Sequence, residues 1–252
     1  MRRPPRFVIA SASISGGHAR VDGAELHHMR DVMRLTAGAE VALLDEANVA
    51  YAGRIERFAP DHALIVLQAS EPEAMVEDLL TLAVGLIKGP RMDFLVEKAA
   101  ELGVTSLLPL LCQRSVVREP SPDRIERWRR LAIAAAKQSL GPRRMIIGSP
   151  LTVAGLVRDV AKETLAVAKE TLAVVCSPGG EALGSLLRDA PRGALTLVCG
   201  PEGGFAPEEV ALMRAAGFRE AALGRTRLRT ETAALAALSI AAGARDELGQ
   251  RG

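Results

Sequence analysis

The chain has 252 residues, of which 48% are hydrophobic and 25% charged, as expected for a globular protein of one or two domains and not for a disordered one. Its three cysteines (Cys112, Cys176 and Cys199) form no C-x-x-C motif, which argues against a zinc ribbon, a dithiol redox site or a disulfide-stabilised fold. No apolar run reaches the roughly 18 residues of a membrane span, and the first residues lack an apolar segment of signal-peptide length. We therefore expect a cytoplasmic protein with no membrane span.

Basic residues are concentrated in the C-terminal two thirds of the chain. Of 32 basic residues, 27 are arginine, whose guanidinium group can bind a phosphate through two parallel hydrogen bonds. Residues 114–144 contain nine basic and three acidic residues, and residues 214–231 contain five arginines and two acids, whereas residues 1–70 have eight of each. This distribution predicts a surface that binds phosphate groups, although a general enrichment in arginine with solvated faces would give the same counts.

Residues 1–72 are predicted to form a small β-rich unit. The expected helix covers residues 25–35, with an apolar face that includes Leu26 and Met29, and Gly38 follows it as a stop signal. The acidic, proline-containing stretch 70–78 is typical of a linker. The strands predicted in this unit are 40–45, 50–58 and 63–67.

Residues 73–252 have a different pattern, in which continuous apolar segments alternate with helical ones. Such segments are typical of strands buried on both faces, and the alternation predicts an α/β domain built on a mostly parallel sheet. The predicted strands are 79–86, 104–112, 172–176, 194–199 and 220–223. The predicted helices are 92–102, 123–140, 152–162, 207–216 and 230–248.

A seven-residue sequence, AKETLAV, occurs twice in succession, at residues 161–167 and 168–174. It is too short to be an architectural repeat. We interpret it as a tandem duplication in a tolerant connection, with a sequencing or cloning artefact as the alternative.

Three junctions between a predicted strand and a predicted helix are candidate sites, because ligands of open α/β sheets bind beyond the carboxyl ends of the strands. The first is the glycine-rich turn 200–204, which matches neither the P-loop nor the G-x-G-x-x-G pattern and could also be a plain structural turn. The second, 223–233, has arginines at alternate positions 225, 227 and 229. The third, 88–103, carries Glu97 and Glu101 beside Lys98, a spacing that favours an ion-paired face over acid–base chemistry.

Neither the histidines nor any nucleophile motif supports metal-dependent or hydrolytic chemistry. All four histidines lie in the first 62 residues, and the adjacent pair His27-His28 lacks the spacing of metal ligands, so we expect no metal site. No G-x-S-x-G motif is present, which argues against a hydrolase that uses a serine nucleophile.

Taken together, several motifs resemble the bacterial 16S ribosomal RNA (uracil-N3)-methyltransferases of the SPOUT superfamily, which carry an N-terminal PUA-like domain. The resemblance runs over nearly the whole chain, and its most specific parts are Gly-Pro-Glu-Gly-Gly at 200–204 followed by Leu-Arg-Thr-Glu-Thr-Ala at 228–233. The other matching segments are 27–34 with Gly38, 88–93, 97–98, 101–103, 114–117, 127–128, 138–139 and 223–224.

The resemblance implies a PUA-like β-barrel at 1–72 and a SPOUT domain at 73–252 whose C-terminal segment forms a trefoil knot. It also implies a cytoplasmic homodimer that transfers a methyl group from S-adenosyl-L-methionine to N3 of a uridine in 16S rRNA, as free rRNA or in the small ribosomal subunit. The implied cofactor-binding residues are Cys176, Ser177, Cys199, Gly200, Pro201, Glu202, Gly203, Gly204, Leu223, Gly224, Leu228 and Thr230. The implied RNA-binding residues are His27, Arg30, Arg34, Lys88, Arg91, Arg118, Arg143 and Arg144.

Arg229 and Arg114 are the candidate catalytic residues, because a guanidinium can stabilise the negative charge that develops on the uracil. The chain departs from the family pattern at Thr226-Arg227 and at Ala206, a weak helix cap, and the duplication precedes the first cofactor loop. Two alternatives stay open. One is a SPOUT methylase that acts on ribose 2′-OH or on tRNA, and the other is a non-catalytic RNA-binding or assembly factor.

Overall fold

A computed structural model describes residues 4–45, 49–68, 79–117, 119–139, 145–167, 171–190 and 193–249. These residues divide into two compact units, one of residues up to 68 together with 137–139, the other of residues 79–136 and 145–249. Among the described residues, no helix is long and apolar enough to cross a membrane.

The first unit is a six-stranded mixed sheet in which only β1 and β4 run parallel. Its core is formed by side chains that alternate along the strands, including Phe7, Val41, Ile55 and Ile65. The strands, in sheet order, are β1 (Arg6–Val8), β4 (Glu40–Leu44), β5 (Ala50–Phe58), β6 (His62–Leu67), β3 (His18–Asp22) and β2 (Ile14–Ser15).

The helix expected at 25–35 is shorter and less regular than predicted. It begins earlier, as α1 (Gly23–His27), and continues as a wider π-helical turn over His28–Val32. Arg34 has a left-handed backbone with φ of 53°, which ends the helical path before Leu35. A single 3-10 turn, Ser11–Ser13, precedes β2.

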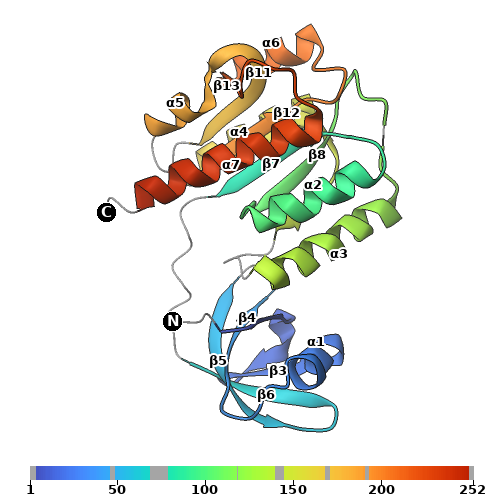
Figure 1. Cartoon of the computed structure of the whole chain (residues 1–252), viewed down its shortest axis with the longest axis vertical. Helices are drawn as coiled ribbons and strands as arrows, with labels where there is room; N and C mark the ends of the chain where they lie inside the picture. The colour runs from blue at the N-terminus through green and yellow to red at the C-terminus, as the bar shows by residue number, and fades with distance from the viewer. Residues whose placement is uncertain are drawn as a thin grey trace. The chain divides into compact units, whose positions relative to one another are not determined.

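The second unit is a parallel sheet, as predicted, in the order β10-β8-β7-β12-β11-β13, with β9 paired to β8 (Figure 1). The short elements β9, β10 and α5 were not predicted. The strands are β7 (Leu80–Gly85), β8 (Ser106–Leu111), β9 (Ile146–Ile147), β10 (Leu151–Thr152), β11 (Leu172–Ala182), β12 (Leu195–Cys199) and β13 (Arg219–Ala222). The helices are α2 (Pro90–Glu101), α3 (Pro122–Ser139), α4 (Val153–Val167), α5 (Leu183–Arg188), α6 (Pro207–Ala215) and α7 (Thr230–Gly249).

Helices cover both faces of this sheet, which explains why its strands are apolar without interruption. Helices α2, α5 and α7 pack on one face over Leu82 and Leu197, and α4 and α6 pack on the other over Ala83 and Val198 (Figure 1). Helix α3 lies against α2, where the fully buried Trp128 donates its indole N–H to Asp93 Oδ1 at 3.0 Å. In the described part of this unit both faces of the sheet are therefore covered, which leaves its ends for ligands.

The two copies of the repeated heptapeptide fold differently. The first copy, 161–167, ends helix α4, whereas Leu172–Val174 of the second copy begins strand β11. In β11 these residues pair with β12, with Val174 opposite Leu197. Tertiary context thus overrides intrinsic preference, since the tripeptide Leu-Ala-Val is helical in one copy and extended in the other.

Candidate active site

Strands β12 and β13 end in glycine-containing loops at one edge of the parallel sheet, and β11, which lies between them, has a glycine-containing irregularity at the same edge. Strand β12 leads into 200–204, β13 leads into 223–229, and β11 has an irregularity at 177–180 before it pairs with β13 again at Glu181. Because all three strands are parallel and adjacent, their carboxyl ends lie together. The structure therefore brings the predicted cofactor-binding residues to a common edge.

The 200–204 loop is fixed by contacts at both of its ends. The Gly204 N–H donates to the Pro201 carbonyl at 2.8 Å, and Gly204 has a φ of 70°, which favours glycine. The buried Thr230 hydroxyl, at the start of α7, donates to the Gly200 carbonyl at 3.0 Å. Thr230, predicted to bind the cofactor, thus anchors the loop to the start of α7.

Glycines allow the segments at this edge to lie in direct contact with one another. A Cβ atom on Gly203 would lie 2.9 Å from the Arg114 carbonyl oxygen, and one on Gly85, at the end of β7, would lie 2.7 Å from Pro201 Cδ. A Cβ on Gly180 would lie 2.6 Å from the carbonyl of Glu220 in β13. Since real Cβ atoms do not approach so closely, these positions hold the loops in contact through the absence of a side chain.

The start of α6 is secured by a residue that the sequence analysis did not single out. Ala206 has no side chain that can cap the helix, but the buried carboxylate of Glu209 accepts the Ala206 N–H at 2.8 Å. The same carboxylate accepts the N–H of Gln113, in the loop after β8, at 2.9 Å. A Glu three residues after a cap position is a known helix-start signal, so its capping role was detectable, whereas its contact with Gln113 was not.

Arg91 joins the 200–204 loop to helix α7. Its Nη1 lies 2.5 Å from Glu202 Oε1 and 3.6 Å from Glu231 Oε1. The hydrogen bond with Glu202 raises the pKa of Arg91. Glu231 is only 8% exposed, and its Oε2 has no hydrogen-bond partner among the described residues. Arg91, predicted to bind RNA, thus has acidic partners within the protein.

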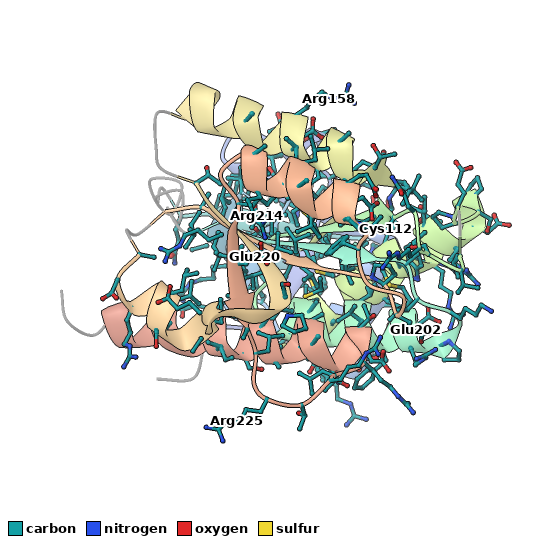
Figure 2. All side chains as sticks on the ribbon, turned by 90° about the horizontal axis from the view of Figure 1, so that it is seen from above. Cys112, Arg158, Glu202, Arg214, Glu220 and Arg225 are labelled. Atoms are coloured by element: carbon teal, nitrogen blue, oxygen red, sulfur yellow. The ribbon has the colours of Figure 1, made fainter. Side chains whose placement is uncertain are left out.

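The two candidate catalytic arginines are both exposed, and both belong to segments at this edge. Arg114 follows β8, and its backbone touches Gly203. Arg229 immediately precedes α7, where its carbonyl accepts the N–H of Ala233 at 2.8 Å. Arg225, earlier in the same loop, projects away from the sheet (Figure 2).

Two cysteines near this edge, Cys112 and Cys199, are not activated nucleophiles. Cys176 and Cys199 are opposite each other in β11 and β12, and contact with Cys176 together with burial raises the pKa of Cys199. Burial raises the pKa of Cys112 to about 12. Cys112 and Cys199 therefore stay as neutral thiols at physiological pH. No group of three or more metal-ligating side chains occurs in the described ranges.

The residues predicted to bind RNA are spread over both units. In the first unit, His27 Nδ1 contacts Asp31 Oδ2 at 2.8 Å, and Arg30 Nε contacts Asp31 Oδ1 at 3.3 Å, while Arg34 is exposed. Hydrogen bonding to Arg30 and, less strongly, to His27 lowers the pKa of Asp31. Arg118, Arg143 and Arg144 lie outside the described residues.

The Glu97, Lys98 and Glu101 group is an ion-paired helix face, as predicted. Lys98 Nζ donates to Glu97 at 2.8 Å and to Glu101 at 2.7 Å. These contacts raise the pKa of Lys98, with the hydrogen bond to Glu101 as the largest cause. Both carboxylates are thus occupied on α2 and take no part in the site.

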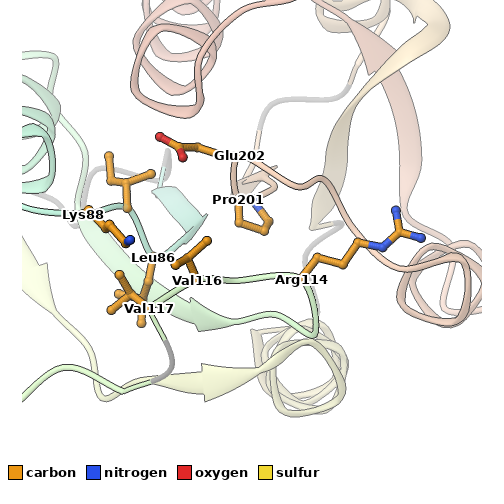
Figure 3. A pocket seen from close by; sticks show the side chains of 8 residues that line it. Leu86, Lys88, Arg114, Val116, Val117, Pro201 and Glu202 are labelled. Carbon is orange, nitrogen blue, oxygen red and sulfur yellow. The ribbon is translucent and has the colours of Figure 1, made fainter.

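A small pocket lies where the ends of β7, β8 and β12 meet (Figure 3). Its volume is about 10 Å³, room for about one water molecule. The Arg114 side chain extends away from the other lining residues. The pocket is lined by Leu86, Ile87, Lys88, Arg114, Val116, Val117, Pro201 and Glu202.

Comparisons with known proteins agree with this architecture. A family model described as an RNA methyltransferase domain matches residues 76–242, and one described as an RNA methyltransferase PUA domain matches residues 21–68. The ribosomal RNA small subunit methyltransferase E of Synechocystis is 32% identical over 236 residues, which cover 93% of this chain and 76% of that protein.

Two solved structures share the fold. The ribosomal RNA small subunit methyltransferase E of Neisseria gonorrhoeae, bound to S-adenosyl methionine, is 26% identical with a TM-score of 0.70, and the match covers 94% of this chain and 96% of that one. A methyltransferase of Legionella pneumophila in complex with the same cofactor is 25% identical with a TM-score of 0.72, over 96% and 98% of the two chains. From the family model and the Synechocystis relative together, the chain belongs to the RNA methyltransferase family that includes the ribosomal RNA small subunit methyltransferases E.

Proposed function

We propose that the protein uses S-adenosyl-L-methionine to methylate N3 of a specific uridine in 16S rRNA. The observation that carries this proposal is the set of three glycine-containing loops at the carboxyl ends of β11, β12 and β13. Membership of the RNA methyltransferase family, with relatives solved in complex with this cofactor, supplies the ligand class.

The residues at these loops fit such a cofactor. Glycines 180 and 203 have no space for a side chain, and a Cβ on Gly200 would lie 3.1 Å from the Phe205 ring, so at these three positions the loops offer a ligand backbone groups and no side chain. A purine and an amino-acid moiety can both be bound by such groups. The residues that would hold the cofactor are Cys176, Ser177, Cys199, Gly200, Pro201, Glu202, Gly203, Gly204, Leu223, Gly224, Leu228 and Thr230.

When bound, S-adenosylmethionine supplies a methyl group on a positively charged sulfur. The protein's own contribution is to align the acceptor with that group and to stabilise charge. N3 of uracil carries a weakly acidic proton, and loss of that proton to solvent places negative charge on the ring before N3 is methylated. Arg229 and Arg114 are our candidates for stabilising it. N3 lies on the Watson–Crick edge, so the target base must be unpaired or flipped out.

We further propose that residues 1–72 form a PUA-like β-barrel that binds the rRNA backbone through His27, Arg30 and Arg34. Residues 73–252 would then be the SPOUT domain, with a C-terminal trefoil knot that positions the cofactor loops. In this proposal the enzyme acts in the cytoplasm as a homodimer. Light scattering coupled to gel filtration tests the dimer.

Mass spectrometry of digested rRNA tests the reaction. Small ribosomal subunits from a strain that lacks this enzyme are incubated with the purified protein and S-adenosylmethionine. We expect 3-methyluridine at one position in 16S rRNA. A 2′-O-methylated nucleoside would instead identify a ribose methylase, and no methylated nucleoside despite cofactor binding would refute the proposal.

A further inference from the structure

The pocket described above lies at the topological switch point of the parallel sheet. Strands β7 and β12 are neighbours, but β7 leads into α2 on one face and β12 leads into α6 on the opposite face. The two connections therefore diverge and leave a crevice between them, which is where open α/β sheets bind ligands. Leu86 to Lys88 follow β7, and Pro201 and Glu202 follow β12, so the pocket occupies this crevice.

Among the described residues, the lining of the crevice is mostly apolar, with one cation that lies inward. Five of its eight residues are aliphatic or proline (Leu86, Ile87, Val116, Val117 and Pro201), and Val116 is 66% exposed. Lys88 lies among them, whereas Arg114 extends away and would stabilise charge on a base held here only from another side-chain rotamer (Figure 3).

The only acidic residue of the lining is neutralised by its own partner. Glu202 forms its ion pair with Arg91, which is outside the lining. The positive charge of Lys88 is therefore not cancelled from within the crevice.

We infer that the rim of this crevice holds the target pyrimidine, with Val116 in contact with the ring face and Lys88 beside the ring oxygens. The inference rests on the proposed function and specifies the part of the site that holds the base. The cavity has room for about one water, so the ring rests on the exposed rim formed by Val116 and Lys88 and does not enter the cavity.

The chemistry of the lining favours a base over a phosphate. A phosphate group is held by several N–H donors or cations, and most of the lining residues here are apolar. A uracil has apolar faces and carbonyl oxygens at its edge, and loss of the N3 proton spreads negative charge onto those oxygens. One ammonium beside an apolar wall matches that pattern.

Photocrosslinking gives a readout that does not depend on catalysis. Small subunits are reconstituted with 16S rRNA that carries 4-thiouridine at the position methylated by the wild-type protein, irradiated with the enzyme, and digested. We expect the crosslinked peptides to contain residues 86–88 or 114–117. Crosslinks confined to other peptides of the chain would overturn the inference.

Two variants test the contacts separately. Lys88→Met removes the charge at similar length, and Val116→Asp places a negative charge on the rim without burying it. We expect each to lower kcat/KM for subunits about tenfold while the Kd for S-adenosylmethionine measured by calorimetry is unchanged. The matched controls, Arg188→Met on α5 and Leu212→Asp on α6, change exposed residues outside the lining and should keep wild-type kcat/KM.

The outcomes separate the two proposals. If the wild-type protein methylates subunits and both variants behave like their controls, the inference is wrong and the proposed function stands. If the wild-type protein binds the cofactor but methylates no rRNA, the proposed function fails, and the inference fails with it.

Discussion

Gly85→Ala should destabilise the protein and weaken cofactor binding, although it adds only one methyl group. Gly85 ends strand β7, and its added Cβ would lie 2.7 Å from Cδ and 2.8 Å from Cα of Pro201. Neither segment can move apart easily, because Gly85 is buried in strand β7 and Pro201 is buried in the 200–204 loop. Overpacking of this kind costs about 1–3 kcal/mol, which for a protein of this size lowers Tm by about 2–12 °C.

The assay is thermal denaturation of the full chain, followed by calorimetric titration with S-adenosylmethionine. Gly243→Ala is the matched control, since that exposed glycine lies within α7 with no atom within 4 Å of its added Cβ. The same chemical change should there stabilise the protein by up to about 1 kcal/mol. If Gly85→Ala shows the Tm and cofactor affinity of the wild type, the tight apposition of β7 and the loop is wrong.

Three further predictions follow from the ion pairs and thiols. Because the ion pair between Arg91 and Glu202 holds the 200–204 loop, Arg91→Met should raise the Kd for S-adenosylmethionine about tenfold. Arg91→Lys should restore part of the affinity, and calorimetry measures both Kd values. Hydrogen bonding to Arg214 lowers the pKa of Glu220, so the pair stabilises the fold above pH 4.5 and this contribution is lost as the pH falls below that value (Figure 2). Melting temperatures of wild type and Arg214→Gln against pH should therefore differ least in acid. Cys176, half-buried at the cofactor edge, should react with iodoacetamide more slowly when S-adenosylmethionine is present.

Each of these has a result that would contradict it. Unchanged affinity in Arg91→Met would mean that the ion pair does not hold the loop. A difference in Tm that is largest below pH 4 would reverse the sign of the Glu220 contribution. Equal alkylation of Cys176 with and without cofactor, in a protein shown by calorimetry to bind it, would place the cofactor away from the end of β11.

The second unit could be predicted well because its local patterns and its fold agree. Strands buried on both faces are continuous apolar runs, and the helices between them end at glycines or begin with proline, so 80–85 and 207–215 were found within a residue or two. The family resemblance was confirmed by the family model that matches residues 76–242.

The first unit was harder to predict because its strands are short and its helix is irregular. Strand β1 has only three residues and β3 only five, too few for a clear alternation of residue types, and both are stabilised by pairing with β4 and β6, partners distant in the sequence. The helix at 23–32 widens to a π turn, which periodicity does not encode.

Contacts within the site were also beyond a local pattern. Gln113 and Glu209 are 96 residues apart, and Arg91 is more than 100 residues from Glu202, so only the assembled sheet reveals that they meet. The resemblance therefore pointed to the loops, while the structure supplied what holds them.

A crystal structure of the protein with S-adenosylmethionine tests the proposed cofactor site most directly. We expect density for the cofactor against residues 177–180, 200–204 and 223–229, at the edge where β12 and β13 end. Cofactor density at another part of the chain, with these three loops unoccupied, would contradict this expectation.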